Sequence, residues 1–186
     1  MNRAFLFPGQ GSQQIGMGKV LADAFASARE VFQEVDDALS LKLSRIMWEG
    51  PESELLLTEN AQPAIMAASI AVVRVLAREG DFELAAQARL VAGHSLGEYS
   101  SLCAAGGLSL ADTARLLRIR GQAMQTAVPL GEGAMAALLG ADIELAEAAA
   151  AEASAEGGIC VVANDNAPGQ VVISGNKAAV ERAGEI

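Results

Sequence analysis

Residues 89–105 read RLVAGHSLGEYSSLCAA, and this stretch decides the fold. Its first part, Arg89–Ala92, is short and apolar and predicts a buried strand, whereas Glu98–Ala105 predicts the start of a helix. The five residues Gly93-His94-Ser95-Leu96-Gly97 lie between them, so no linker separates the strand from the helix. A strand that turns into a helix through Gly-x-Ser-x-Gly is the pattern of a nucleophile elbow in an α/β protein.

Ser95 is the chemically important residue of this turn. In such an elbow the serine hydroxyl projects out of the sheet, and the next helix points its free N–H groups and its positive dipole end at the same place. The backbone N–H of Leu96 can then stabilise an oxyanion. We therefore predict that Ser95 is a catalytic nucleophile. The alternative is an ordinary Gly-Ser turn, because both residues are common in turns.

The residues up to 130 predict the main part of a large α/β domain that resembles the α/β hydrolases, with a parallel sheet around the elbow. A strand at Arg3–Phe7 is followed by a glycine-containing loop and then by helical patterns. The helix expected at Gln62–Arg78 is apolar over most of its circumference, which is typical of a central, buried helix. The other helices are expected at Met17–Phe25, Val31–Ala38, Leu41–Trp48 and from Ser109 to near Pro129.

The pattern changes after Gly131, and residues 131–186 predict a small ferredoxin-like α+β domain. Its order is strand, helix, strand, strand and helix, which is a ferredoxin-like unit that ends before its last strand. We expect Asn176 to cap the last helix. The preceding elements are expected at Ala134–Leu139, Asp142–Ala155, Ile159–Ala163 and Val171–Ser174.

Composition excludes several classes of protein. The chain has 23 acidic and 13 basic residues and a formal charge of -10, which argues against a nucleic acid or an anionic membrane as the main partner. Cys103 and Cys160 are too few for a disulfide framework or a cysteine-rich metal site. The amino terminus lacks a signal-peptide core, and charged residues interrupt the longest apolar stretch. We expect a cytoplasmic monomer without a metal or resident cofactor.

Three further motifs accompany Gly93–Tyr99 in the chain. They are Phe7-Pro8-Gly9-Gln10-Gly11-Ser12-Gln13, Gln62-Pro63-Ala64 and Arg120-Gly121-x-x-Met124-Gln125. In this order, the four motifs resemble the malonyl-CoA:acyl carrier protein transacylases of fatty acid synthesis. The related acyltransferase domains of polyketide synthases share these signatures, and the likeness runs along the whole chain.

The resemblance implies a role for each site residue. Ser95 would take the malonyl group from CoA as an ester and yield it to the phosphopantetheine thiol of acyl carrier protein. The backbone N–H groups of Gln10 and Leu96 would form the oxyanion hole, and Gln62 would line the pocket. Arg120 would bind the malonyl carboxylate, which suits its planar fork of donors. Without the motifs, Gln10 and Gln62 would be ordinary polar contacts and Arg120 a charge on a helix surface.

His94 is the only histidine in the sequence, and its position beside Ser95 suggests a general base. Neighbouring side chains at the end of a strand point to opposite sides, so we expect His94 to face away from the hydroxyl and to make a structural hydrogen bond. The resemblance implies instead a base in a later segment, beyond Ile186. We therefore expect a fragment, whose remainder supplies that base, the last strand of the small domain and further strands of the main sheet.

The expected partners are malonyl-CoA and an acidic carrier protein. The carrier would dock on local cations, for which the candidates are Arg115, Arg118, Lys177 and Arg182; solvated helix faces are the other interpretation. Two other functions stay open. A serine hydrolase or thioesterase would use the same elbow with water as the acceptor, and a non-catalytic fragment would bind CoA or carrier protein without becoming acylated.

Overall fold

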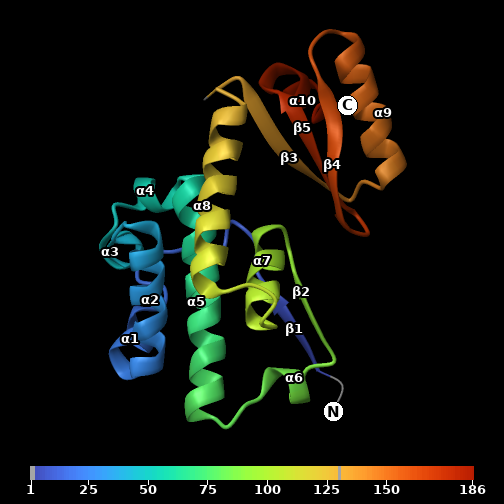
Figure 1. The fold of residues 1–186 in the computed structure, drawn as a ribbon. Helices are drawn as coiled ribbons and strands as arrows, with labels where there is room; N and C mark the ends of the chain where they lie inside the picture. Colours follow the sequence, from blue (N-terminus) through green and yellow to red (C-terminus); the bar gives the residue numbers. More distant parts are fainter. Residues whose placement is uncertain (1–2, 130) are drawn as a thin grey trace. The chain divides into compact units, whose positions relative to one another are not determined.

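The computed structural model of the chain describes residues 3–129 and 131–186. Its internal contacts form two compact units, one ending at Gln125 and the other beginning at Thr126 (Figure 1). The elements that begin in the first unit are β1 (Ala4–Phe7), α1 (Lys19–Ala24), α2 (Ala26–Leu39), α3 (Leu43–Glu49), α4 (Glu52–Leu56), α5 (Thr58–Glu79), α6 (Leu84–Gln87), β2 (Leu90–Gly93), α7 (Leu96–Ala104) and α8 (Leu110–Ala127).

The first unit is an α/β structure with a parallel pair of strands. β1 and β2 pair in parallel, with Ala4 opposite Leu90 and Phe7 opposite Gly93. Helix α7 packs on both strands and also on α5, while α1 to α4 contact the other side of α5 (Figure 1). The predicted α/β class and the predicted parallel sheet are therefore confirmed.

Helix α5 is the centre of the first unit. All residues from Asn60 to Ala67 are buried, and they pack among buried side chains of the surrounding helices. By length and composition α5 could cross a membrane, but 61% of its most apolar window is buried inside the protein, as in the core helix of a soluble protein. Its second half is less enclosed, because Val72 is 49% exposed. The predicted burial is thus confirmed for the first half of the helix.

The helix boundaries differ most from the sequence prediction at the starts of α5 and α2. α5 begins at Thr58 rather than at Gln62, and α2 begins at Ala26 rather than at Val31. For α5 the reason is Pro63, which usually marks a helix boundary but here lies inside the helix. The short helices α4 and α6 were not predicted, because segments of five and four residues show no helical periodicity.

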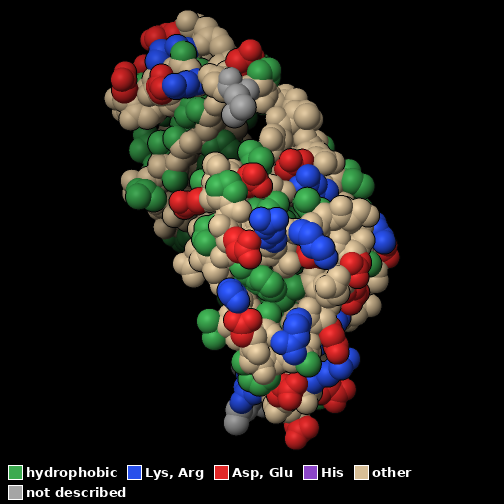
Figure 2. Space-filling view, turned by 90° about the vertical axis from the view of Figure 1, so that its left-hand side faces the viewer, with side chains coloured by type: hydrophobic (Ala, Val, Ile, Leu, Met, Phe, Trp, Pro, Cys, Tyr) green, Lys and Arg blue, Asp and Glu red, His purple; other side chains and the backbone are tan. Residues whose placement is uncertain are grey.

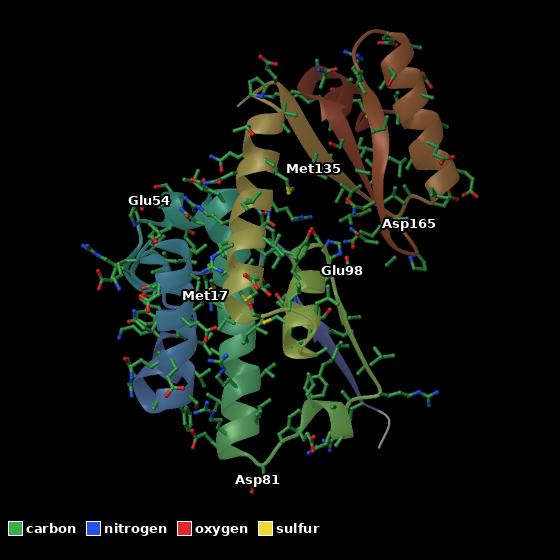
Figure 3. All side chains as sticks on the ribbon, viewed as in Figure 1. Met17, Glu54, Asp81, Glu98, Met135 and Asp165 are labelled. Atoms are coloured by element: carbon green, nitrogen blue, oxygen red, sulfur yellow. The ribbon has the colours of Figure 1, made fainter. Side chains whose placement is uncertain are left out.

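The second unit has the order strand, helix, strand, strand, helix. Its three strands form an antiparallel sheet with the order β3-β5-β4. Small side chains of α9 and α10 pack on one face of this sheet around Ile173. Met135 lies on β3 and is 63% exposed (Figure 3). The elements are β3 (Gly133–Leu139), α9 (Ile143–Ala155), β4 (Cys160–Ala167), β5 (Gln170–Asn176) and α10 (Lys177–Ala183).

The predicted capping role of Asn176 is wrong in its chemistry. Asn176 stands at the N-cap position of α10, but its side chain makes no capping hydrogen bond. Its Oδ1 instead accepts from the backbone N–H of Ile159 over 2.7 Å. The side chain therefore ties the start of β4 to the end of β5. Helix α9 does have a side-chain cap, because Asp142 accepts from the N–H of Leu145.

Candidate active site

Ser95 occupies the turn between β2 and α7. Its backbone has φ 54° and ψ -110°, and a residue other than glycine with positive φ is strained by about 1–3 kcal/mol. The side chain is exposed, whereas Leu96, the first residue of α7, is buried. Since the first N–H groups of a helix have no partner within the helix, the N–H of Leu96 has no acceptor within α7.

Gly93 and Gly97 provide space for this turn. A Cβ on Gly93 would lie 1.9 Å from the carbonyl carbon and oxygen of Gly97, and a Cβ on Gly97 would lie 2.3 Å from the carbonyl oxygen of Phe7. Neither glycine has the left-handed φ that Ser95 has. The backbones of the strand, the turn and the helix are therefore in direct contact. A larger residue at Gly93 or Gly97 would force them apart.

Arg120 and Gln62 meet at Ser95. Nη2 of Arg120 donates to Oγ of Ser95 over 2.9 Å, and Nη1 donates to Oε1 of Gln62 over 2.6 Å. Gln62 is fully buried, and its Nε2 lies 3.4 Å from the sulfur of Met124. The guanidinium carbon of Arg120 lies 5.8 Å from the ring centroid of Tyr99, within the range of a cation–π contact. The structure thus brings together three of the predicted site residues.

Gln10 is held at a different point. Its side chain donates from Nε2 to Oγ1 of Thr58 over 3.2 Å, and the hydrogen bonds of the described residues do not include one between Gln10 and Ser95. The loop itself does approach the elbow, because a Cβ on Gly9 would lie 2.6 Å from Cδ2 of His94. The next glycine, Gly11, has φ 105°, which only glycine adopts without strain. The loop's shape therefore depends on both glycines.

His94 is an exposed residue whose backbone N–H donates to the carbonyl oxygen of Phe7 over 3.1 Å. Among the described residues, the imidazole makes no such structural hydrogen bond, and the ring packs beside Gly9 instead. Within residues 3–129 and 131–186, the group that hydrogen-bonds to Oγ of Ser95 is the guanidinium of Arg120. A guanidinium cannot accept a proton, so it cannot serve as the base.

Three residues near the site were not assigned a role from the sequence: Thr58, Tyr99 and Met124. Tyr99 follows Ser95 by one helical turn and Met124 follows Arg120 by one turn, so the i, i+4 spacing was the available signal. Glu98 stands at the amino-terminal end of α7, close to the elbow (Figure 3). An acidic side chain in the first turn of a helix interacts favourably with the helix dipole.

Two of the four cations considered for carrier docking have structural partners. Arg118 contacts the first turn of α5, and Arg182 donates to backbone carbonyls of Ala153 and Gly157. Arg115 and Lys177 are exposed and pair with acidic residues on their own helices. On the face formed by α1 to α4, basic and acidic side chains alternate without a continuous basic patch (Figure 2). The described part of the chain also has no group of three or more potential metal-binding His, Cys, Asp or Glu side chains.

Comparisons with known proteins agree with this geometry. The acyl transferase domain family matches residues 4–185. A malonyl CoA-acyl carrier protein transacylase of Bacillus subtilis (strain 168) is 50% identical over 98% of this chain and 56% of its own length. The Escherichia coli (strain K12) protein of the same name is 48% identical over 97% of this chain and 57% of its own length. The chain therefore spans somewhat more than half the length of these relatives.

Solved structures give the same result. An acyl-carrier-protein-S-malonyltransferase from Bartonella henselae is 61% identical, with a TM-score of 0.93 over 98% of this chain and 58% of that chain. A malonyl-transacylase in complex with a type II PKS acyl-carrier protein is 46% identical, with a TM-score of 0.91 over 100% of this chain and 58% of that chain. The match covers both units and every motif around Ser95, so the chain belongs to the acyl transferase domain family.

Proposed function

We propose that this protein is an acyltransferase that moves a malonyl group from malonyl-CoA to the phosphopantetheine thiol of acyl carrier protein in fatty acid biosynthesis. The guanidinium of Arg120 carries the proposal. It lies against Oγ of Ser95 and, among the described residues, forms no ion pair with a carboxylate. An unpaired arginine fork beside a nucleophile suits an acyl group that has a free carboxylate of its own.

The proposed reaction is a double displacement at Ser95. Oγ attacks the thioester carbonyl of malonyl-CoA, the C–S bond breaks, and CoA leaves as the thiol with the proton of the hydroxyl. The carrier thiol then attacks the serine ester, the C–O bond breaks, and Oγ regains a proton. Neither step is an oxidation or a reduction, and we propose that the protein uses neither a resident cofactor nor a metal ion.

Two groups would stabilise the tetrahedral intermediate of each step. The N–H of Leu96 lies at the amino-terminal end of α7, where the helix dipole also favours negative charge. We propose the N–H of Gln10 as the second donor, supported by the close approach of its loop to the elbow at Gly9. Gln62 would hold the guanidinium of Arg120 beside Ser95, because the buried Gln62 side chain accepts from Nη1 of Arg120.

The described residues that hydrogen-bond to Oγ of Ser95 do not include a proton acceptor. Arg120 cannot accept a proton, and the imidazole of His94 packs against residues 8–13, which we call the glutamine loop. We therefore propose that the general base is a residue other than Arg120 and His94.

We also propose a sheet type, domain bounds, a partner and an oligomeric state for this protein. The parallel strands and the elbow suit a sheet of the α/β-hydrolase kind, and the strand order β3-β5-β4 suits a ferredoxin-like domain over residues 131–186, with 1–130 as the main domain. The complex of a related transacylase with its carrier protein supports acyl carrier protein as the partner. We further propose that the protein is a cytoplasmic monomer.

The test is to incubate the protein, with any sequence that extends beyond these residues, with malonyl-CoA and to follow its mass. We expect one malonyl group on Ser95, transfer of that group when carrier protein is added, and no adduct in Ser95→Ala. Free malonate that forms at the same rate without carrier protein would indicate a hydrolase instead. Binding of CoA with no covalent adduct would indicate a non-catalytic module.

A further inference from the structure

Pro63 deprives α5 of one backbone hydrogen bond. In a regular helix the N–H of residue 63 would donate to the carbonyl oxygen of Glu59, but proline has no N–H. That carbonyl still has a donor, because Nη1 of Arg118 on α8 donates to it over 3.1 Å. Arg118 therefore replaces the hydrogen bond that Pro63 removes.

The same guanidinium makes two further contacts with this turn of α5. Nη1 also donates to Oδ1 of Asn60, and Nη2 lies 3.3 Å from the Glu59 carboxylate. The side chains of Arg118 and Glu59 are each only 23% exposed, so water screens their ion pair less than it screens a surface pair. A backbone carbonyl, an amide and a carboxylate are thus bound by one side chain, and we call this set of contacts the Arg118 clamp.

The two helices touch at backbone distance beside the clamp. A Cβ on Gly121 would lie 2.5 Å from Cα of Glu59 and 2.7 Å from the carbonyl oxygen of Thr58. Backbones this close have no side chains between them to absorb a shift. A movement of the first turn of α5 would therefore change how α8 presents its neighbouring side chains.

These neighbouring side chains are those of the candidate site. Arg120, two residues after Arg118, donates to both Gln62 and Ser95. Thr58, one residue before Glu59, accepts from the side chain of Gln10. The first two turns of α5 thus support both the guanidinium at Ser95, through Gln62, and the glutamine loop, through Thr58.

We propose that Arg118 is a positioning residue, which holds the first turn of α5 so that Gln62 keeps Arg120 aligned on Ser95. Arg118 contacts neither Ser95 nor the acyl group, and it sets selectivity for acyl groups that carry a carboxylate. This inference rests on the proposed function, because the selectivity belongs to that reaction. It also gives Arg118 a role inside the protein rather than on a carrier-binding surface.

The first experiment compares Arg118→Met and Arg118→Lys with Arg115→Met. The control is matched because Arg115 lies one turn earlier on α8 and pairs with the exposed Asp112. In Arg118→Met we expect the ratio of kcat/KM for malonyl-CoA to that for acetyl-CoA to fall about tenfold, the typical effect of losing a hydrogen bond to a charged group. In Arg118→Lys the ratio should fall less than in Arg118→Met, and in Arg115→Met the ratio should stay as in the parent protein.

The second experiment tests the link to Pro63 by a double-mutant cycle. In Pro63→Ala the new N–H can donate to Glu59, so Arg118→Met should reduce the selectivity ratio less in that background than in the parent protein. Equal losses in both backgrounds would overturn the replacement of the missing hydrogen bond. Lower stability with an unchanged selectivity ratio would show that Arg118 is merely structural and would overturn the positioning role.

A third measurement does not depend on activity. Amide hydrogen exchange at Asn60 and Ala61, whose N–H groups donate to the carbonyl of Leu57, should become faster in Arg118→Met and stay as in the parent in Arg115→Met. If the parent protein takes up no acyl group from malonyl-CoA, the proposed function is refuted. Faster exchange in Arg118→Met would still support the Arg118 clamp. Unchanged exchange in Arg118→Met would overturn the clamp whatever the activity.

Discussion

Arg120 donates a hydrogen bond to Oγ of Ser95 over 2.9 Å, although 25 residues separate them in the chain. The contact joins the middle of α8 to the turn before α7, and Oε1 of Gln62 on α5 accepts from Nη1 of the same guanidinium. Three helices therefore meet at the one strained residue of the elbow.

Replacement of Arg120 should remove selectivity rather than acylation itself. In Arg120→Ala we expect kcat/KM for malonyl-CoA to fall about 10- to 100-fold, the range for lost hydrogen bonds to a charged group, while that for acetyl-CoA falls much less. Arg120→Lys keeps the charge without the fork of donors, so its kcat/KM for malonyl-CoA should lie between that of the parent protein and that of Arg120→Ala. Steady-state kinetics with both substrates check this, and equal losses for both would refute a role in carboxylate binding.

Gly93→Ala should destabilise the first unit. A methyl group there would meet the backbone of Gly97 at 1.9 Å, and overpacking of this kind costs typically about 1–3 kcal/mol or more. Gly107→Ala is the matched control, since its Cβ would lie 3.4 Å from the nearest atom. Urea unfolding measures both variants, and a Gly93→Ala protein as stable as Gly107→Ala would contradict the close contact of strand and helix.

Asp36 should stabilise α3 from a distance. This buried carboxylate accepts from the backbone N–H of Ser44 over 2.9 Å and from its hydroxyl over 2.7 Å. Asp36→Ala should lower the free energy of unfolding by about 1–3 kcal/mol, because it leaves these donors without their acceptor. Asp37→Ala, at an exposed neighbour, should change it by less than about 0.5 kcal/mol. Similar unfolding midpoints for the two variants would argue against a stabilising role of the hydrogen bonds between Asp36 and Ser44.

The Cys103 thiol should react slowly at neutral pH. Burial raises its pKa above the ordinary value, so the folded protein holds less of the reactive thiolate than the unfolded chain. The folded state keeps its proton to higher pH, so stability should fall as pH rises from the ordinary thiol pKa to the raised one. Alkylation by iodoacetamide, followed with and without urea, checks this; equal rates in the two would show that the fold does not protect the thiol.

The sequence predicted the parts of this structure that depend on local pattern. The elbow at Gly93–Gly97 could be placed because strand, turn and helix signals follow one another without a gap. The parallel sheet followed from the same pattern. Each unit's main helices were also predicted, although Pro63 moved the expected start of α5 to the wrong residue.

Contacts between distant residues could not be predicted in this way. The replacement of a lost helical hydrogen bond by Arg118 depends on how closely α8 approaches α5, and no spacing within either helix encodes that distance. The side chain of Asn176 likewise bonds across strands rather than along its own helix. A local rule identified Asn176 as a hydrogen-bonding residue but not its partner, whereas Arg118 was expected only as a docking cation or a charge on a solvated helix face.

The parallel pairing of β1 with β2 has a consequence for biosynthesis. Ala4 lies opposite Leu90, so the first strand leaves the ribosome long before its neighbour has been translated. Until then its backbone groups have no sheet partner, and pairing over such a sequence separation is slow. Nascent chains in which Leu90 has not yet left the ribosome should therefore be the ones that most need a chaperone.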